Sequence, residues 1–282
     1  MKWLVIFVAV LASSAAHAEA CDLYPTTRPA DVTGYVEMAT SCLNVPPEPA
    51  RFDADAEAKF ARNINAARRA EGLAPLDVRA DLLPAARFHS LDQIWNGTFG
   101  HDGAAGRSQG DRISALDRTL VRSFSAENVA MVSGAFDPEI VPNMLHNGLM
   151  ESPGHRRNIL AEDATHMAVG VARVRDAWVV TQLFARVEGA LDRPAPTRLT
   201  GAGNALSMQA QLNAWSPHAV RAGPSTADAP DPCRANCPET RVSVIEVEGR
   251  RPLEVGQGYR AIYLSGPSWD VPGQVSEGAD AP

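Results

Sequence analysis

Apolar residues recur at helical spacing in two segments of the first half of the chain. We predict a helix over about 54–71, because Gly72 stands where a helix C′ glycine belongs. A second helix is predicted from Asp81, a capping residue, to Gly97. The apolar stripes follow i, i+4, i+7 and i, i+3, i+7 spacing: Phe60, Ile64 and Ala67 in the first helix, and Phe88, Leu91 and Trp95 in the second.

Two further helices and a hairpin are predicted later in the chain. The helices begin at Asp137 and Ser152, each a capping residue followed by proline. Apolar residues then alternate over 167–171 and return over 178–184, which indicates a β-hairpin. Residues 100–111 contain four glycines and no large apolar side chain, so we expect a solvent-facing loop. Helices followed by a hairpin indicate an α+β sandwich and not a parallel βαβ sheet.

The flanking segments have a different composition. The segment before the first helix has several prolines and no sustained period, which predicts an irregular leader. After Glu188 the chain becomes rich in breakers, and strands are expected over 241–247 and 259–264. The predicted parts are a signal peptide, an irregular leader, a principal domain, a small β-rich module and a disordered tail, at residues 1–18, 19–53, 54–188, 189–270 and 271–282.

The first eighteen residues have the form of a secretory signal. Lys2 precedes an apolar run over 3–12, and small residues lead to a cleavage point after Ala18. The run is well short of the ~20 residues needed to span a bilayer. We therefore predict a secreted or periplasmic protein without an integral membrane segment. An uncleaved anchor and a lipid anchor on Cys21 are the alternatives.

Four cysteines are present, at positions 21, 42, 233 and 237. In an oxidising compartment an even number of cysteines is most simply paired as disulfides. Proximity favours the pairs Cys21–Cys42 and Cys233–Cys237. A zinc site built from all four is the alternative, but their spacing is not that of a zinc ribbon or finger.

Charge and local motifs exclude several functions. Lys+Arg of 26 against Asp+Glu of 33 gives a net charge of −7, so nucleic-acid binding is not expected. The sequence has no histidine pair at i, i+4, no G-x-S-x-G, no glycine-rich phosphate loop and no free-cysteine nucleophile. His155 is predicted at the third position of its helix, where the dipole favours a neutral imidazole that could bind a metal or accept a proton.

Six short motifs occur in order over about residues 54–188. They are Asn63 to Arg68 with Leu73 and Leu76; Leu82, Ala85, Ala86 and His89; Phe99 to His101; Ala126 to Val129; Ser152 to Leu160; and Val169 to Val171 with Thr181 to Phe184. Together they resemble the CAP superfamily, the domain shared by cysteine-rich secretory proteins, insect venom antigens and plant pathogenesis-related proteins. The Ser-Pro-Gly-His-Arg motif resembles the bacterial-type members.

The resemblance implies a three-layer α-β-α sandwich and a shallow cavity where His101, Glu127 and His155 converge. In the family such a cluster can hold a divalent metal, often zinc, which implies His101 and His155 as metal ligands. Imidazole and carboxylate are ligand types that zinc accepts. The family pattern includes a further acidic residue, for which Glu151 is the nearest candidate and Glu139 the next.

The resemblance leaves several functions open. We expect a non-enzymatic, secreted binding module whose cavity engages a lipid, a sterol or a protein partner. The alternative is a metal-dependent hydrolase of protease or esterase type, with Glu127 as general base toward a metal-bound water. The cluster could also be a hydrogen-bond network that links the helices to the sheet, and the C-terminal module could be the recognition element.

Overall fold

The computed structural model describes residues 21–23, 32–103, 106–191, 193–194 and 197, and five strands further along the chain. The elements are α1 (Val32–Asn44), β1 (Ala50–Phe52), α2 (Ala54–Ala70), β2 (Asp77–Val78), the 3-10 turn η2 (Ala80–Leu82), α3 (Leu83–Asn96), α4 (Gln109–Leu116), β3 (Leu120–Ser133), α5 (Val141–Glu151), α6 (Pro153–Ile159), β4 (His166–Val174), β5 (Ala177–Leu191), β6 (Leu206–Leu212), β7 (Trp215–Gly223), β8 (Val244–Val247), β9 (Ile262–Tyr263) and β10 (Ser268–Trp269).

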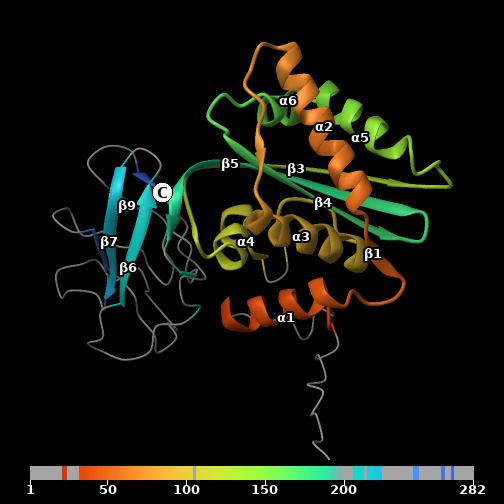
Figure 1. Ribbon diagram of the computed structural model, residues 1–282. Coiled ribbons are helices and arrows are strands. Elements are labelled where there is room, and N and C mark those ends of the chain that lie inside the picture. Colours follow the sequence, from red (N-terminus) through yellow and green to blue (C-terminus); the bar gives the residue numbers. More distant parts are fainter. Residues whose placement is uncertain are drawn as a thin grey trace, which may run out of the picture.

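The principal domain has helices on both faces of an antiparallel sheet. Helices α2, α5 and α6 lie on one face, and α3 and α4 lie on the other (Figure 1). Side chains alternate across β4, so Met167, Val169 and Val171 enter the core beneath α2, α5 and α6. Ala168 and Ala172 point to the opposite face, which packs against α3 and α4. The predicted α+β fold with three layers is confirmed.

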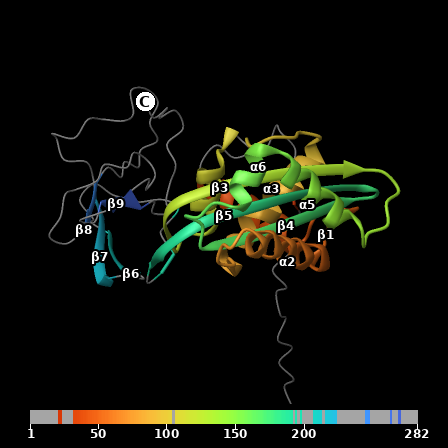
Figure 2. The same cartoon turned by 90° about the horizontal axis from the view of Figure 1, so that it is seen from above.

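The central strands are long and antiparallel. β5 pairs with β4 on one side, from His166↔Ala185 to Val174↔Ala177, and with β3 on the other. Figure 2 shows these strands running side by side. β1 and β2 pair with the outer edge of β4. Between the positions where β1 and β2 pair with β4, Glu57 of α2 accepts a hydrogen bond from Val171 N at 3.1 Å. The same carboxylate binds Arg87 of α3 in a bidentate ion pair. The helices on both faces are therefore tied at this edge.

Helix α3 lies very close to the sheet at Gly170. A Cβ placed at Gly170 would lie 2.2 Å from the backbone nitrogen of Arg87. Ser90 of α3 donates to Gly170 O at 2.9 Å and is 2.8 Å from Thr181 Oγ1 of β5. Because Gly170 has no side chain, α3 can lie this close to the sheet.

The leader differs from the irregular segment predicted over 19–53. Residues 32–44 form helix α1, which lies on the outer side of α3, and residues 50–52 form β1 (Figure 1). The prediction was wrong for these residues because the flanking prolines hid a helical repeat of buried positions: Val32, Tyr35, Ala39 and Cys42. Cys21 and Cys42 form a disulfide, as their proximity predicts.

Several predicted boundaries are also displaced. Helix α5 begins at Val141, whereas Asp137 closes a turn by accepting from Glu139 N. Ser152 precedes α6, but its side chain makes no capping hydrogen bond; its backbone oxygen accepts from Arg156 N instead. Helices α2 and α3 end as predicted, before Gly72 and Gly97, whose positive φ angles suit glycine.

The segment from 100 to 133 contains structure that the sequence patterns did not predict. Ser108 and Asp111 form a capping box at the start of α4, and Arg107 is buried. The prediction of a solvent-facing loop over 100–111 was therefore wrong for the second half of that range. Strand β3 follows and occupies fourteen residues. Its polar side chains interrupt the alternation by which a half-buried strand is recognised.

Beyond the principal domain the sheet continues. β5 extends to Leu191, past the boundary predicted after Glu188, and its last residues pair with β6. β6 and β7 were not predicted, whereas β8 and β9 lie within the two strand segments expected there. The predicted signal peptide, the Cys233–Cys237 pair and the predicted disordered tail lie outside the described residues. Across the described residues, no helix has the length and apolar character that a membrane crossing requires.

Candidate functional site

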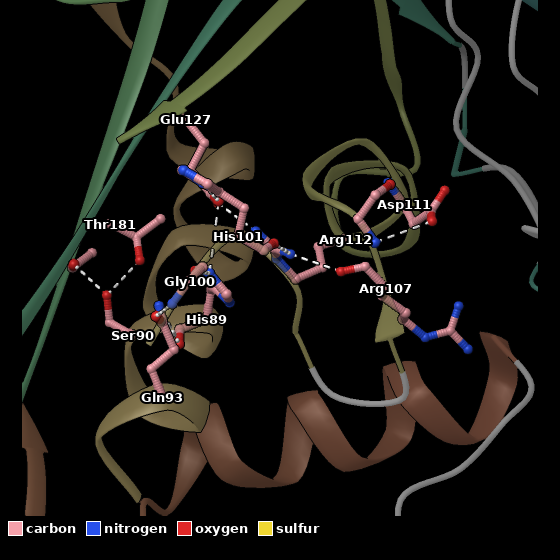
Figure 3. A network of polar contacts seen from close by, with 12 residues as sticks. His89, Ser90, Gln93, Gly100, His101, Arg107, Asp111, Arg112, Glu127 and Thr181 are labelled. Carbon is pink, nitrogen blue, oxygen red and sulfur yellow. Dashed lines mark hydrogen bonds and ion pairs between the residues drawn. The ribbon is translucent and has the colours of Figure 1, made fainter. Parts of the chain in front are cut away.

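A polar cluster lies where several elements meet beside the middle of β3 (Figure 3). The segment after α3 carries His101, and β3 carries Glu127. Helix α4 contributes Arg112 and α3 contributes His89, while His155 stands on α6 close enough to His101 for their charges to interact. The structure thus brings together the three residues implied by the resemblance and adds two that sequence reasoning missed.

Glu127 is the buried centre of this cluster, with a side chain only 2% exposed. Its Oε1 lies 3.0 Å from His101 Nδ1 and 3.7 Å from His89 Nε2, and its Oε2 accepts a hydrogen bond from Arg112 Nη2. Burial alone would raise the pKa of Glu127. The hydrogen bond from His101 and the positive charge of Arg112 outweigh burial and lower this pKa, so the carboxylate is ionised at neutral pH.

His101 presents an exposed imidazole on this buried carboxylate. Its side chain is 60% exposed, and its hydrogen bond to Glu127 raises its pKa. Because Glu127 is ionised, Nδ1 carries the proton and donates. In the described part of the chain, Nε2 of His101 has no hydrogen-bond partner. The ring therefore offers its second nitrogen to an external group.

The backbone beside His101 is fixed by side chains from two helices. Gly100 O accepts from His89 Nε2 at 3.1 Å, and Gly100 N donates to Gln93 Oε1 at 2.8 Å. His89 and Gln93 stand one turn apart on α3, so one helix face holds both backbone groups of Gly100. Arg112 Nη1 donates to His101 O at 2.6 Å. His101 is consequently exposed but anchored.

His155 is the third residue of α6, as predicted. Its pKa is lowered by burial and by the neighbouring charge of His101. The neutral form of the His155 imidazole is therefore favoured, as expected. The causes are its burial and the charge of His101. Asn128 Nδ2 donates to His155 O at 3.0 Å, and Asn158 Nδ2 donates to Glu127 O at 3.0 Å. These bonds hold α6 against the strand that carries Glu127.

The two candidate acids differ in position. Glu151 is the exposed last residue of α5. Glu139 has a side chain 85% exposed, and its Oε2 lies 3.4 Å from Lys59 Nζ, so it belongs to a surface ion pair.

Sequence patterns did not predict a role for Arg112. The available signal was the Ser108 and Asp111 capping pattern, which places Arg112 in the first turns of a short helix.

The donor set does not fit a metal centre with three protein ligands. Among the described residues, no group of three or more His, Cys, Asp or Glu side chains could hold a metal ion. Both oxygens of Glu127 are engaged, by His101 and by Arg112. Metal binding by His101 and His155 stays a prediction.

His89 is expected to make stability depend on pH. Its buried ring has a pKa lowered to about 4, by burial first and by the charge of Arg112 second. An unfolded histidine titrates near 6.5, so between about pH 6.5 and 4 the unfolded chain binds a proton that the folded chain does not. The stability contribution of His89 is therefore present above pH 6.5 and lost as the pH falls through 4.

We expect His89→Gln to remove this dependence, because a glutamine amide can still donate to Gly100 O. Over that window, the free energy of unfolding of the wild type should fall by about 3 kcal/mol more than that of the variant. Urea unfolding at a series of pH values measures both. Equal slopes for the two proteins would contradict the assignment of a buried, neutral His89.

The fold and the cluster together define an α-β-α sandwich with an exposed imidazole on a buried carboxylate. A family model described as the cysteine-rich secretory protein family, CAP, matches residues 61–184. The segment from 61 to 184 is therefore a CAP domain, and it contains His101, Glu127 and His155.

Three of the proteins that match are bacterial. The uncharacterized protein YkwD of Bacillus subtilis (strain 168) is 32% identical over 128 residues, which are 45% of this chain and 46% of YkwD, so the chain spans about half of that relative. An outer surface protein from Borrelia burgdorferi is 16% identical with a TM-score of 0.43, covering 49% of this chain and 98% of that one. An extracellular protein containing a SCP domain from Bacillus anthracis str. Ames is 28% identical with a TM-score of 0.40, covering 48% and 41%.

Proposed function

We propose that this chain is an extracytoplasmic, non-enzymatic binding module that takes a lipid or sterol at the cluster of His101, Glu127 and His155. The observation that carries the proposal is the exposed imidazole of His101, held by hydrogen bond on a carboxylate that is almost fully buried. A polar group that is already ordered loses little further freedom when a ligand binds. Preorganisation of this kind suits recognition.

The surroundings of His101 favour an amphiphilic ligand. Phe99 is 55% exposed, so a large apolar side chain stands in solvent two residues before His101 in the chain. A ligand hydroxyl or carboxylate can bond to Nε2 of His101 while an apolar body covers Phe99. Sites for small molecules commonly combine apolar contact with a few placed polar groups.

The state of Glu127 argues against the hydrolase alternative. A general base works best with a pKa near the operating pH. Here the pKa of Glu127 is lowered, and its two oxygens already accept from His101 and Arg112. This carboxylate is suited to orienting His101 and is a poor proton acceptor for a water molecule.

The extracytoplasmic location is supported by two features of the N-terminal region. Residues 1–18 have the three-part pattern of an export signal. The Cys21–Cys42 disulfide follows shortly after it, and disulfides persist in oxidising compartments.

The proposal is tested by recording imidazole NMR signals of the mature protein during titration with sodium palmitate, with a cyclodextrin complex of cholesterol, and with zinc chloride. We expect palmitate or cholesterol to shift the His101 signals and His101→Ala to abolish binding. His166→Ala is the matched control, because His166 contacts Thr165 at the start of β4, outside the cluster.

Four results would contradict the proposal. The His101 signals could stay unchanged with both lipids, or His166→Ala could weaken binding as much as His101→Ala. Release of p-nitrophenol from an ester in a manner abolished by Glu127→Gln would instead support the hydrolase. A response to zinc chloride alone would support the metal site and overturn the choice of lipid as ligand.

A further inference from the structure

We infer that Arg112 is a positioning residue of this site, whose guanidinium holds the backbone of His101 and the carboxylate of Glu127 in one arrangement. The inference concerns the same cluster and rests on the proposed function for its biological meaning. Its physical content is separate: without Arg112, the exposed imidazole would leave the buried carboxylate even though both residues are intact.

Three groups of the protein accept hydrogen bonds from the Arg112 side chain. Nη1 donates to His101 O at 2.6 Å and to Arg107 O at 2.8 Å, and Nη2 donates to Glu127 Oε2. The two carbonyls lie at the two ends of the segment 101–107, and Glu127 stands on β3. A planar guanidinium presents its donors in a fixed fork, so it sets the relative position of the groups it binds. Figure 3 shows Arg112 between this segment and Glu127.

The segment and the arginine fit each other closely at Gly103. A Cβ at Gly103 would lie 2.8 Å from Cδ of Arg112 and 3.4 Å from its Nη1. Gly103 N also donates to Arg107 O at 3.0 Å, and Gly103 O accepts from Gly106 N at 3.0 Å. Gly103 thus lies directly against the Arg112 side chain, and a residue larger than glycine at position 103 would press on it.

Another buried arginine in the same region provides a matched control. Arg122 of β3 is as buried as Arg112 and bonds to Ser114 Oγ and to Gly110 O. These two partners lie on α4 and outside the cluster. Removing Arg122 should therefore cost stability without disturbing His101.

Arg112 could instead act through its charge alone, and the two possibilities predict opposite results. The charged and titratable groups facing His101 are Glu127 from β3, Arg112 from α4, His89 from α3, His155 from α6 and Asp102 beside it. If only charge mattered, loss of Arg112 would free Glu127 to bind His101 more strongly, and lysine would replace arginine without effect. If Arg112 positions the segment, both changes release His101 from Glu127.

The test is the nitrogen-15 NMR spectrum of the imidazoles in ligand-free protein, at a pH where His101 is neutral. In the wild type His101 should show the Nδ1–H tautomer, because the hydrogen bond to Glu127 selects it. We expect Arg112→Lys and Arg112→Gln to lose this signature and to give His101 the tautomer mixture of a solvent-exposed histidine. Arg122→Gln should keep it.

Gly103→Ala is a second route to the same result, because it displaces Arg112 and leaves its charge in place. We expect this variant also to lose the Nδ1–H signature, and it carries the test if the Arg112 variants do not fold. Retention of the signature in Arg112→Lys or in Gly103→Ala would overturn the inference, as would its loss in Arg122→Gln. The spectra need no ligand, so failure of lipid binding leaves this result unaffected.

Discussion

Replacing Gly170 with alanine is expected to lower the free energy of unfolding by about 4 kcal/mol, at the upper end for single substitutions. The added Cβ would lie 2.2 Å from Arg87 N, 2.3 Å from Ala86 C and 2.6 Å from Arg87 Cα. All three atoms belong to the backbone of α3 and cannot move away by a side-chain rotation. The helix must withdraw from the sheet, which also breaks the hydrogen bond from Ser90 to Gly170 O.

Urea unfolding followed by circular dichroism measures this effect, with Gly148→Ala as the control. Gly148 lies within α5, and a Cβ there would meet nothing within 4 Å. Alanine is the better helix former, so the control variant should be unchanged or more stable by up to about 1 kcal/mol. A loss below about 1 kcal/mol in Gly170→Ala would mean that α3 can shift without breaking its packing.

Glu127→Ala is expected to cost about 3–5 kcal/mol, because it leaves the buried guanidinium of Arg112 without its counterion. Glu127 and Arg112 each have side chains only 2% exposed, so water does not replace the lost partner. The hydrogen bond to His101 is lost as well. Since the pKa of Glu127 is lowered in the folded protein, its contribution is present above its unfolded value, near 4.3, and is lost as the pH falls through the folded value.

The difference in unfolding free energy between wild type and Glu127→Ala should therefore be largest at neutral pH and decrease toward acid pH. Glu139→Ala is the control, because the ion pair of Glu139 with Lys59 is at the surface and should contribute at most about 1 kcal/mol. If the two glutamate variants lost similar stability at pH 7, Glu127 would not be the counterion of a buried arginine.

The parts of the fold that followed from the sequence have strong local signals. Gly72 and Gly97 end α2 and α3, and the alternation around 167–184 predicts the hairpin of β4 and β5. β3 lacked such a signal, because Glu127 and Asn128 occupy strand positions that an ordinary half-buried strand would fill differently. Their side chains serve the cluster and its contacts to α6, so tertiary partners compensate for the broken pattern.

The residues of the site also differ in how far the sequence could predict them. Short motifs pointed to His101, Glu127 and His155 through resemblance, since each lies in a recognisable block of sequence. Arg112 and His89 could not be assigned by spacing alone. Arg112 acquires its role only when the segment after α3 folds back over α4, and one buried arginine resembles the other arginines of the chain until its partners are known.

The length of β5 has a mechanical consequence. Its first part is paired on both sides, with β3 and β4, and its last residues pair with β6. Ladder hydrogen bonds run perpendicular to the strands. A pull applied to the end of β5 that leads toward β6 would therefore load its bonds to β3 and β4 in shear, all at once, and would not open them one after another. A tension at this end of β5 would therefore be carried by the whole strand that neighbours Glu127.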